Sequence, residues 1–202
     1  MINFLDKNSK TGEHKTSLTI TYPRTVNIIF GYFPYPELLH SYIIDIKNNL
    51  KKSMYGYTNV KGGMTDWRYF VDNDNFNKFL SFLINKNQNS HPDIFQYFFE
   101  KNYVADAWGN EMKKGDSLTP HHHPCYHGIL YLTKGCDLIL PELNITITPK
   151  PGDYYLFPPN ILHGFDKIND DQIRYSLIFN IKEKDQFKFN KKLENINDRK
   201  DG

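Results

Sequence analysis

The stretch TPHHHPCYH, residues 119–127, holds four of the eight histidines in this chain of 202 residues. Neutral imidazole is a common protein ligand for iron, zinc, nickel and copper. Side chains two residues apart on a strand point to the same side, so His121 and His123 can bind one ion while His122 points away. The spacing therefore predicts half of a metal site.

His127 has the same parity as this pair, although Pro124 interrupts the strand. Three interpretations stay open for His127: a fourth ligand, a substrate contact, or a core histidine with its own hydrogen-bond partner. For His121 and His123, the alternative is a surface cluster with chance metal affinity. The flanking prolines and a suitable histidine further along the chain favour a built site.

That histidine is His163, which ends the run PGDYYLFPPNILH at residues 151–163. Pro-Gly-Asp is typical of a tight turn, residues 154–157 of a buried strand, and Pro158-Pro159-Asn160 of a corner that ends the strand. A histidine that follows a rigid corner is well placed to complete a metal site.

Arg174 and Ser176 begin the next expected strand and share one of its faces. A guanidinium fork beside a hydroxyl is a good receptor for a carboxylate. The alternative for Arg174 is an ion pair with Asp170 or Asp171, which precede it.

With these residues in view, the segment from about residue 104 to 180 resembles the non-haem Fe(II)- and 2-oxoglutarate-dependent oxygenases. The similarity is to their small, prolyl-hydroxylase-like phage and microbial members. The matching elements are, in order, Trp108-Gly109-Asn110, Gly115, Pro120 to Pro124, Gly128-Ile129-Leu130-Tyr131, Pro151-Gly152-Asp153, His163 and Arg174-Tyr175-Ser176. An ordered set is far more specific than any single element. One position departs from the family, because His123 stands where most members have a carboxylate ligand.

The resemblance implies an Fe(II) site held by His121, His123 and His163 and a 2-oxoglutarate site beside it. These histidines and Arg174 are the implied catalytic residues. The implied cosubstrate contacts are Arg174, Ser176, Tyr131 and Asn110, with Tyr131 alternatively a plain core residue. The implied reaction consumes O2, converts 2-oxoglutarate to succinate and hydroxylates a substrate that the sequence does not identify.

The second hypothesis is a cupin that binds metal through three or four histidines and does not use 2-oxoglutarate. Gly115, His121, His123 and His127 nearly meet the first cupin spacing, with His127 where glutamate is usual, and residues 152–163 fit the second. The third hypothesis is a jelly-roll binding module without activity. Arg174 separates the first two hypotheses, because a cupin gives it no required role.

Bulk composition is compatible with one packed domain of 23.9 kDa, with 39% hydrophobic and 15% aromatic residues. The net charge of +2 is too small to indicate nucleic acid. Cys125 and Cys136 make no disulfide framework, which favours a reducing cytoplasm. No signal peptide or membrane span is visible. An exposed sheet edge would permit a homodimer.

Hydrophobic periodicity predicts a mostly β fold, a double-stranded β-helix of the jelly-roll or cupin kind, with two or three supporting N-terminal helices. We expect N-terminal strands and helices in residues 17–102, the metal-binding jelly roll in 103–182, and polar ends at 1–16 and 183–202. The expected helices begin at Pro36, near Asp74 and at Pro92. The expected strands are residues 18–22, 26–30, 103–112, 126–133, 137–140, 144–148, 153–157, 162–166 and 173–182. Residues 62–67 are expected to form a surface loop with a docked Trp67, or alternatively a substrate entrance.

Overall fold

The computed structural model describes residues 17–21, 25–51 and 59–184. The strands are β1 (Ser17–Thr21), β2 (Thr25–Tyr32), β3 (Val60–Lys61), β4 (Gly63–Met64), β5 (Asn102–Met112), β6 (Ser117–His121), β7 (Tyr126–Tyr131), β8 (Leu138–Leu140), β9 (Ile145–Ile147), β10 (Asp153–Phe157), β11 (His163–Phe165) and β12 (Arg174–Glu183). The helices are α1 (Pro36–Asn48), α2 (Asp74–Asn87), α3 (Pro92–Phe95), α4 (Phe98–Lys101) and the short η2 (Pro141–Leu143).

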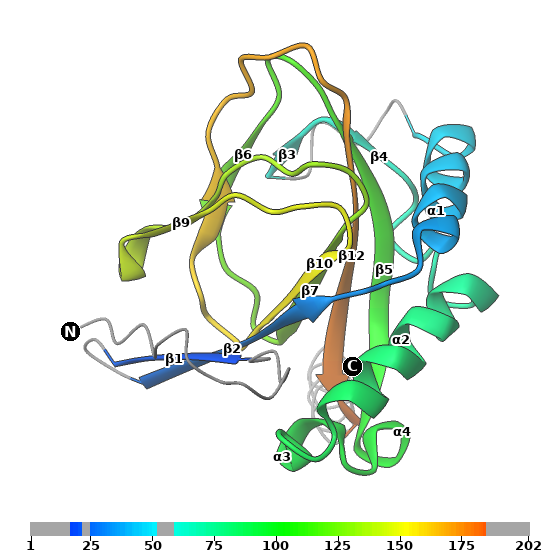
Figure 1. Cartoon of the computed structure of the whole chain (residues 1–202), viewed down its shortest axis with the longest axis vertical. Helices are drawn as coiled ribbons and strands as arrows, with labels where there is room; N and C mark the ends of the chain where they lie inside the picture. Colours follow the sequence, from blue (N-terminus) through cyan, green and yellow to red (C-terminus); the bar gives the residue numbers. More distant parts are fainter. Residues whose placement is uncertain (1–16, 22–24, 52–58, 185–202) are drawn as a thin grey trace, which may run out of the picture.

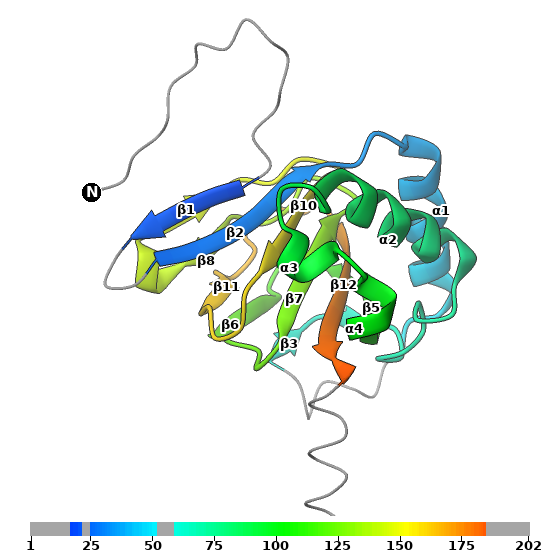
Figure 2. The ribbon, with the colours of Figure 1, turned by 90° about the horizontal axis from the view of Figure 1, so that it is seen from below.

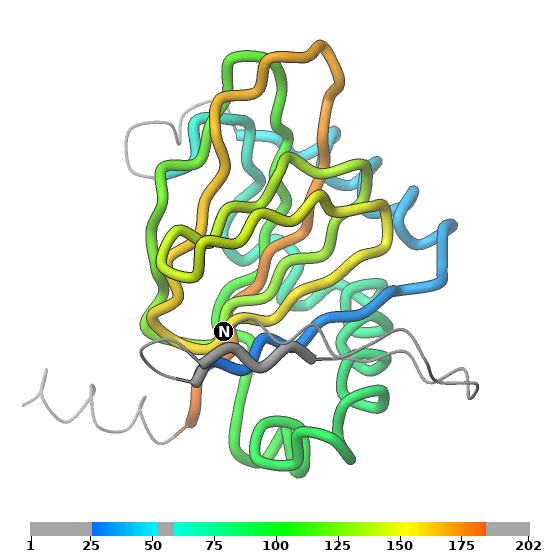
Figure 3. Tube along the Cα trace, turned by 60° about the vertical axis from the view of Figure 1, so that its left-hand side comes forward, coloured from blue at the N-terminus to red at the C-terminus, as the bar shows by residue number. Residues whose placement is uncertain are grey.

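Two sheets face each other (Figure 1). The larger has seven strands in the order β1-β2-β10-β7-β12-β5-β4, and the smaller has five in the order β3-β6-β11-β8-β9. The tube in Figure 3 shows both layers built mainly from the C-terminal half of the chain, with α1 and α2 to one side. This arrangement confirms the predicted jelly roll. The N-terminal strands β1 and β2 extend the same sheet as β5 and β12.

Helices α1 and α2 cover the outer face of the larger sheet (Figure 2). Helix α1 buries Tyr42 and Ile46, and α2 buries Phe76 and Phe79. Both rings of α2 meet Phe179 of β12, with centroids 5.7 and 5.8 Å apart. Apolar residues at helical spacing thus place this core outside the sheet, and the interior between the sheets stays available for a site.

The single helix predicted from Pro92 onward is wrong. The chain forms two short helices, α3 and α4, because Gln96 is extended and Tyr97 adopts a left-handed conformation with φ 57°. The break turns the chain, so that Phe98 is buried while its neighbour Phe99 is 64% exposed.

The strand pattern also differs from the prediction at three places. The spacing of His121 and His123 predicts a strand here, but β6 is polar, contains Pro120 and is missing from the strands expected from periodicity. It ends at His121, so His123 lies beyond the strand. Strands β3 and β4 occupy a region predicted as loop. They are two residues long, which is too short to show a period. Trp67 docks on Trp108 with ring centroids 4.6 Å apart, as expected. Residues 62–67 are not a surface loop, however, because they include β4 and the buried Met64 and Thr65.

Several predictions fall on residues that the structure does not describe: the polar lead-in at 1–16, the break at 23–24 and all but the first two residues of the tail at 183–202. Within the described ranges, no helix combines the length and apolar character needed to span a membrane.

Candidate metal centre and the cavity beside it

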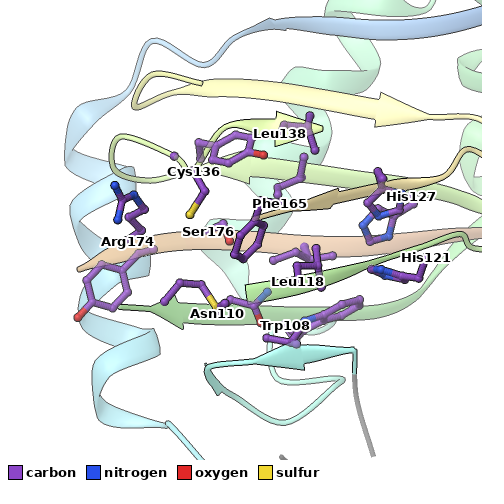
Figure 4. A pocket seen from close by; sticks show the side chains of 18 of the residues that line it. Trp108, Asn110, Leu118, His121, His127, Cys136, Leu138, Phe165, Arg174 and Ser176 are labelled. Carbon is purple, nitrogen blue, oxygen red and sulfur yellow. The ribbon is translucent and has the colours of Figure 1, made fainter. Parts of the chain in front are cut away.

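A narrow cavity of about 60 Å³ lies between the two sheets. Its floor comes from β5, β7 and β12 of the larger sheet, and Leu118, Leu138 and Phe165 reach it from the smaller sheet. Figure 4 shows His121 and His127 at one end and Arg174 at the other. The apolar roof residues had not been singled out from the sequence, where they are ordinary members of short strands.

Three rows of residues cross β5, β12 and β7 side by side and form the floor, except that Asp106 and Asn180 do not line the cavity. The rows, in that strand order, are Asp106–Asn180–His127, Trp108–Ile178–Ile129 and Asn110–Ser176–Tyr131. Members of successive rows are two residues apart, so all three rows lie on one face of the sheet. The two outer rows are polar and the middle row is apolar. At the usual strand rise, the outer rows are about 13 Å apart.

Three histidines gather at one end of the floor. His121 and His163 are direct cross-strand partners on β6 and β11. Their ligand atoms and that of His123 all lie within 4.8 Å of one another. The Nε2 atoms of His121 and His123 are 3.0 Å apart, the separation expected for two adjacent ligands that each lie about 2.1 Å from a metal ion. The donor set therefore fits a bound metal ion.

Backbone carbonyls orient two of these rings. Nδ1 of His121 lies 3.0 Å from Thr119 O, and Nδ1 of His163 lies 2.9 Å from Ile161 O. A carbonyl only accepts, so each Nδ1 carries the proton and each Nε2 is left with its lone pair. This is the arrangement that metal-binding histidines usually have. Nε2 of His163 is buried without a partner.

The predicted proline corner at residues 158–160 helps to hold His123 as well as His163. Asn160, with φ 65°, ends the corner, and its N–H donates to His123 O over 2.8 Å. This bond ties the loop after β6 to the segment that leads into β11. Sequence reasoning had placed His123 on a strand, and the structure holds it through this bond instead.

Burial keeps the cluster neutral. It is the main reason that the pKa of His123 falls to about 3, with the neighbouring His121 and His163 lowering it further. Burial likewise lowers the pKa of His163 to about 4 and that of His121 below its ordinary value. At neutral pH all three imidazoles are neutral, with one nitrogen free of a proton, as metal binding requires.

His127 is buried beside the cluster but is not one of the three grouped histidines. Its Nδ1 lies 2.9 Å from Oδ1 of Asn180, and its ring stacks on His123 with centroids 3.8 Å apart and planes 6° apart. Burial lowers the pKa of His127 well below its ordinary value.

Arg174 is 8% exposed at the other end of the cavity. Its Nη2 pairs with the carboxylate of Asp170, the partner that the alternative interpretation had named, and its Nη1 donates to Gln172 O over 3.1 Å. Its Nε is buried without a partner. Ser176 is next to Tyr131 in the sheet register, and both line the same cavity.

Six of the seven predicted site residues line this one cavity, and His123 lies beside it in the cluster formed by His121, His123 and His163. Six buried side-chain polar atoms lack a hydrogen-bond partner in the described part of the chain. Four of them belong to residues that line the cavity: Trp108 Nε1, Asn110 Oδ1, His163 Nε2 and Arg174 Nε. Buried polar atoms are rarely left unpaired, so their concentration here indicates a ligand site.

Known structures share this fold. A viral collagen prolyl hydroxylase from Paramecium bursaria Chlorella virus-1, in complex with 2-oxoglutarate, is 15% identical with a TM-score of 0.56, over 77% of this chain and 94% of that one. HygX from Streptomyces hygroscopicus, with nickel and 2-oxoglutarate bound, is 10% identical with a TM-score of 0.55, over 76% and 82%. A Pseudomonas putida prolyl-4-hydroxylase is 12% identical with a TM-score of 0.54, over 77% and 91%.

No protein-family model and no curated protein sequence matches the chain. The structural similarities define the class: the chain has the double-stranded β-helix fold found in 2-oxoglutarate-dependent oxygenases.

Proposed function

We propose that this protein is a non-haem Fe(II)- and 2-oxoglutarate-dependent oxygenase that hydroxylates an as yet unidentified substrate. The observation that carries the proposal is the single cavity with neutral histidines at one end and a buried arginine at the other. Unpaired polar atoms belong to residues at both ends.

In this proposal His121, His123 and His163 hold Fe(II), and the bound ion supplies the O2 activation that the protein side chains cannot provide. His123 replaces the carboxylate of the usual two-histidine site, so the three ligands carry no charge. The dianionic 2-oxoglutarate then neutralises the charge of the ion.

The floor of the cavity suits 2-oxoglutarate. Arg174 has five N–H donors, of which Asp170 and Gln172 use two, so three remain for the C5 carboxylate. Ser176 adds a hydroxyl, and an arginine fork beside a hydroxyl binds a carboxylate strongly. The apolar middle row would contact the two methylenes of the cosubstrate.

The two remaining predicted contacts lie on either side of Ser176 in the same row. Asn110 would contact 2-oxoglutarate through its amide N–H, and its buried Oδ1, which has no partner, would accept from a donor group of the substrate. Tyr131 also packs against Tyr155, with ring centroids 6.1 Å apart, so it serves the core as well as the cavity. The half-buried rings of His121 and His123 mark the side from which a substrate would approach.

Succinate formation tests the proposal. Purified protein is supplied with Fe(II), ascorbate, 2-oxoglutarate and O2, with His163→Ala as the matched variant. Slow succinate release by the wild type that the variant lacks is expected even without the primary substrate. Tight metal binding without succinate formation or 2-oxoglutarate binding would contradict the proposal.

That result would favour the second candidate, a cupin-like metal enzyme that does not use 2-oxoglutarate. The proximity of His127 to the three histidines is the observation that favours it. A buried Arg174 in the same cavity argues for the oxygenase. A cytoplasmic location, which suits Fe(II) chemistry and free thiols, and a homodimer stay predictions.

A further inference from the structure

His127 lies against the metal cluster, yet the proposed reaction gives it no part. Its ring centroid is 3.8 Å from that of His123 and 4.9 Å from that of His163. The cupin spacing would make it a fourth ligand, so its geometry decides what it does.

A chain of hydrogen bonds across three strands fixes the ring of His127. Asp106 on β5 carries a carboxylate that accepts from Asn180 Nδ2 over 3.3 Å. The amide of Asn180 is thereby oriented with Oδ1 toward His127 Nδ1, 2.9 Å away. An amide oxygen only accepts, so His127 carries its proton on Nδ1 and is anchored through it.

The stack of His127 on His123 prevents the two rings from sharing one metal ion. An ion lies in the plane of an imidazole that binds it, close to the nitrogen lone pair. The two ring planes are 6° from parallel with centroids 3.8 Å apart, so an ion in one plane is well out of the other. His123 completes the group of three ligand atoms, and His127 does not.

His123 also differs from the other two histidines of the cluster in how its ring is held. His121 and His163 each donate Nδ1–H to a carbonyl two residues earlier. In the described chain the ring of His123 has no such bond, and its Nε2 lies 3.0 Å from Nε2 of His121 as one ligand atom beside another. Its backbone is held by Asn160, but its ring is held by the stack.

We propose that His127 is a positioning residue for His123: the Asp106–Asn180–His127 chain holds a flat ring against which the third metal ligand is oriented. The inference rests on the proposed metal site. His127 would orient the ring of His123, as a backbone carbonyl orients the rings of His121 and His163. His123 is the one ligand that replaces the usual carboxylate.

Cobalt(II) titration tests the inference without turnover, because bound Co(II) has a visible absorption spectrum that reports its ligand set. The comparison is between wild type, His127→Ala and His127→Phe. Both variants leave Asn180 Oδ1 without its donor, so they differ only in whether a flat ring remains. We expect His127→Ala to weaken Co(II) binding by about 10- to 100-fold, the range for residues that support metal ligands. His127→Phe keeps the flat ring but loses its bond to Asn180, so it should restore affinity only to within about 5-fold of wild type, with an unchanged spectrum.

Equal losses in both variants, with an altered spectrum, would make His127 a ligand and overturn the inference. Unchanged affinity in both would overturn it as well. No Co(II) binding by the wild type would overturn the metal site itself, which distinguishes the two failures. If His127→Ala does not fold, Asp106→Asn replaces it, because it changes one atom at the end of the chain of hydrogen bonds. A loss of about 2- to 5-fold is then expected, and no loss would contradict the positioning role.

Discussion

The two ends of the cavity are built in different ways. At the histidine end, His121 and His163 come from short strands of the smaller sheet, and local carbonyls orient their rings. At the arginine end, Arg174 and Ser176 lie on β12, whose ladder with β5 fixes their position. Strand pairing and local hydrogen bonds act at both ends, but the strands of the histidine end belong to the smaller sheet and those of the arginine end to the larger. Metal binding and cosubstrate binding should therefore be separable by substitution.

The largest effect is expected from His163→Ala, because His163 is the most buried member of the metal cluster. Loss of one of three ligands should weaken metal affinity by more than about 100-fold. Isothermal titration with Co(II) measures it, and His122→Ala is the matched control, since His122 is exposed and outside the cluster. A similar loss in His122→Ala would contradict the assignment of ligands.

Arg174→Ala should weaken 2-oxoglutarate binding and leave metal binding unchanged. Removal of a buried partner from a charged pair costs about 2–5 kcal/mol, so 2-oxoglutarate affinity should fall by about 30- to 5000-fold. Metal affinity should stay within about 2-fold of wild type, since the arginine end does not contribute a ligand. Lys167→Ala is the control, because Lys167 lies outside the cavity lining but near the same loop. A loss of metal affinity in Arg174→Ala would show that the ends are not separable.

Because the spacing between the two polar outer rows of the cavity floor is fixed, the cavity should discriminate between 2-oxo diacids of different length. 2-Oxoadipate has one more methylene than 2-oxoglutarate and cannot satisfy both ends of a rigid floor, so we expect it to bind at least about 10-fold more weakly. Competition titrations on the metal-loaded protein measure the difference. Equal affinity for both diacids would mean that Arg174 does not bind the distal carboxylate.

The smallest effect is expected from Asp170→Asn. Asp170 pairs with Arg174 but does not line the cavity, so its removal frees charge on the guanidinium without changing the floor. 2-Oxoglutarate binding should tighten by about 2- to 5-fold, the range for a partly exposed ion pair. Asp171→Asn changes the net charge equally but removes a partner of exposed Lys114, and it should have no effect. Weaker binding in Asp170→Asn would mean that the ion pair orients Arg174 for its ligand.

The sequence predicted the jelly roll because an ordered set of motifs and short strands with alternating apolar residues can be recognised in a single sequence. It also predicted the inward parity of His127 and the shared face of Arg174 and Ser176, because strand alternation depends on local geometry alone. The roles of these residues stay predictions. What failed was set by long-range contacts or by single dihedral angles: the polar strand β6, and the left-handed Tyr97 that breaks the third helix.

The position of His123, too, could be predicted from the sequence only in part. The two-residue spacing correctly brought His123 next to His121, but it could not reveal that β6 ends between them or that Asn160 holds the loop. Nor could it reveal the stack on His127, which depends on the register of β7 against β12 and β5.

The central claim, that one cavity binds a metal ion and 2-oxoglutarate together, is tested most directly by an anaerobic titration with Fe(II) followed by 2-oxoglutarate. The readout is the visible charge-transfer band of Fe(II) chelated by the cosubstrate, in wild type and Arg174→Ala. We expect a band that saturates in the wild type and needs at least about 30-fold more 2-oxoglutarate in the variant. Tight Fe(II) binding with no band at any 2-oxoglutarate concentration would contradict the account.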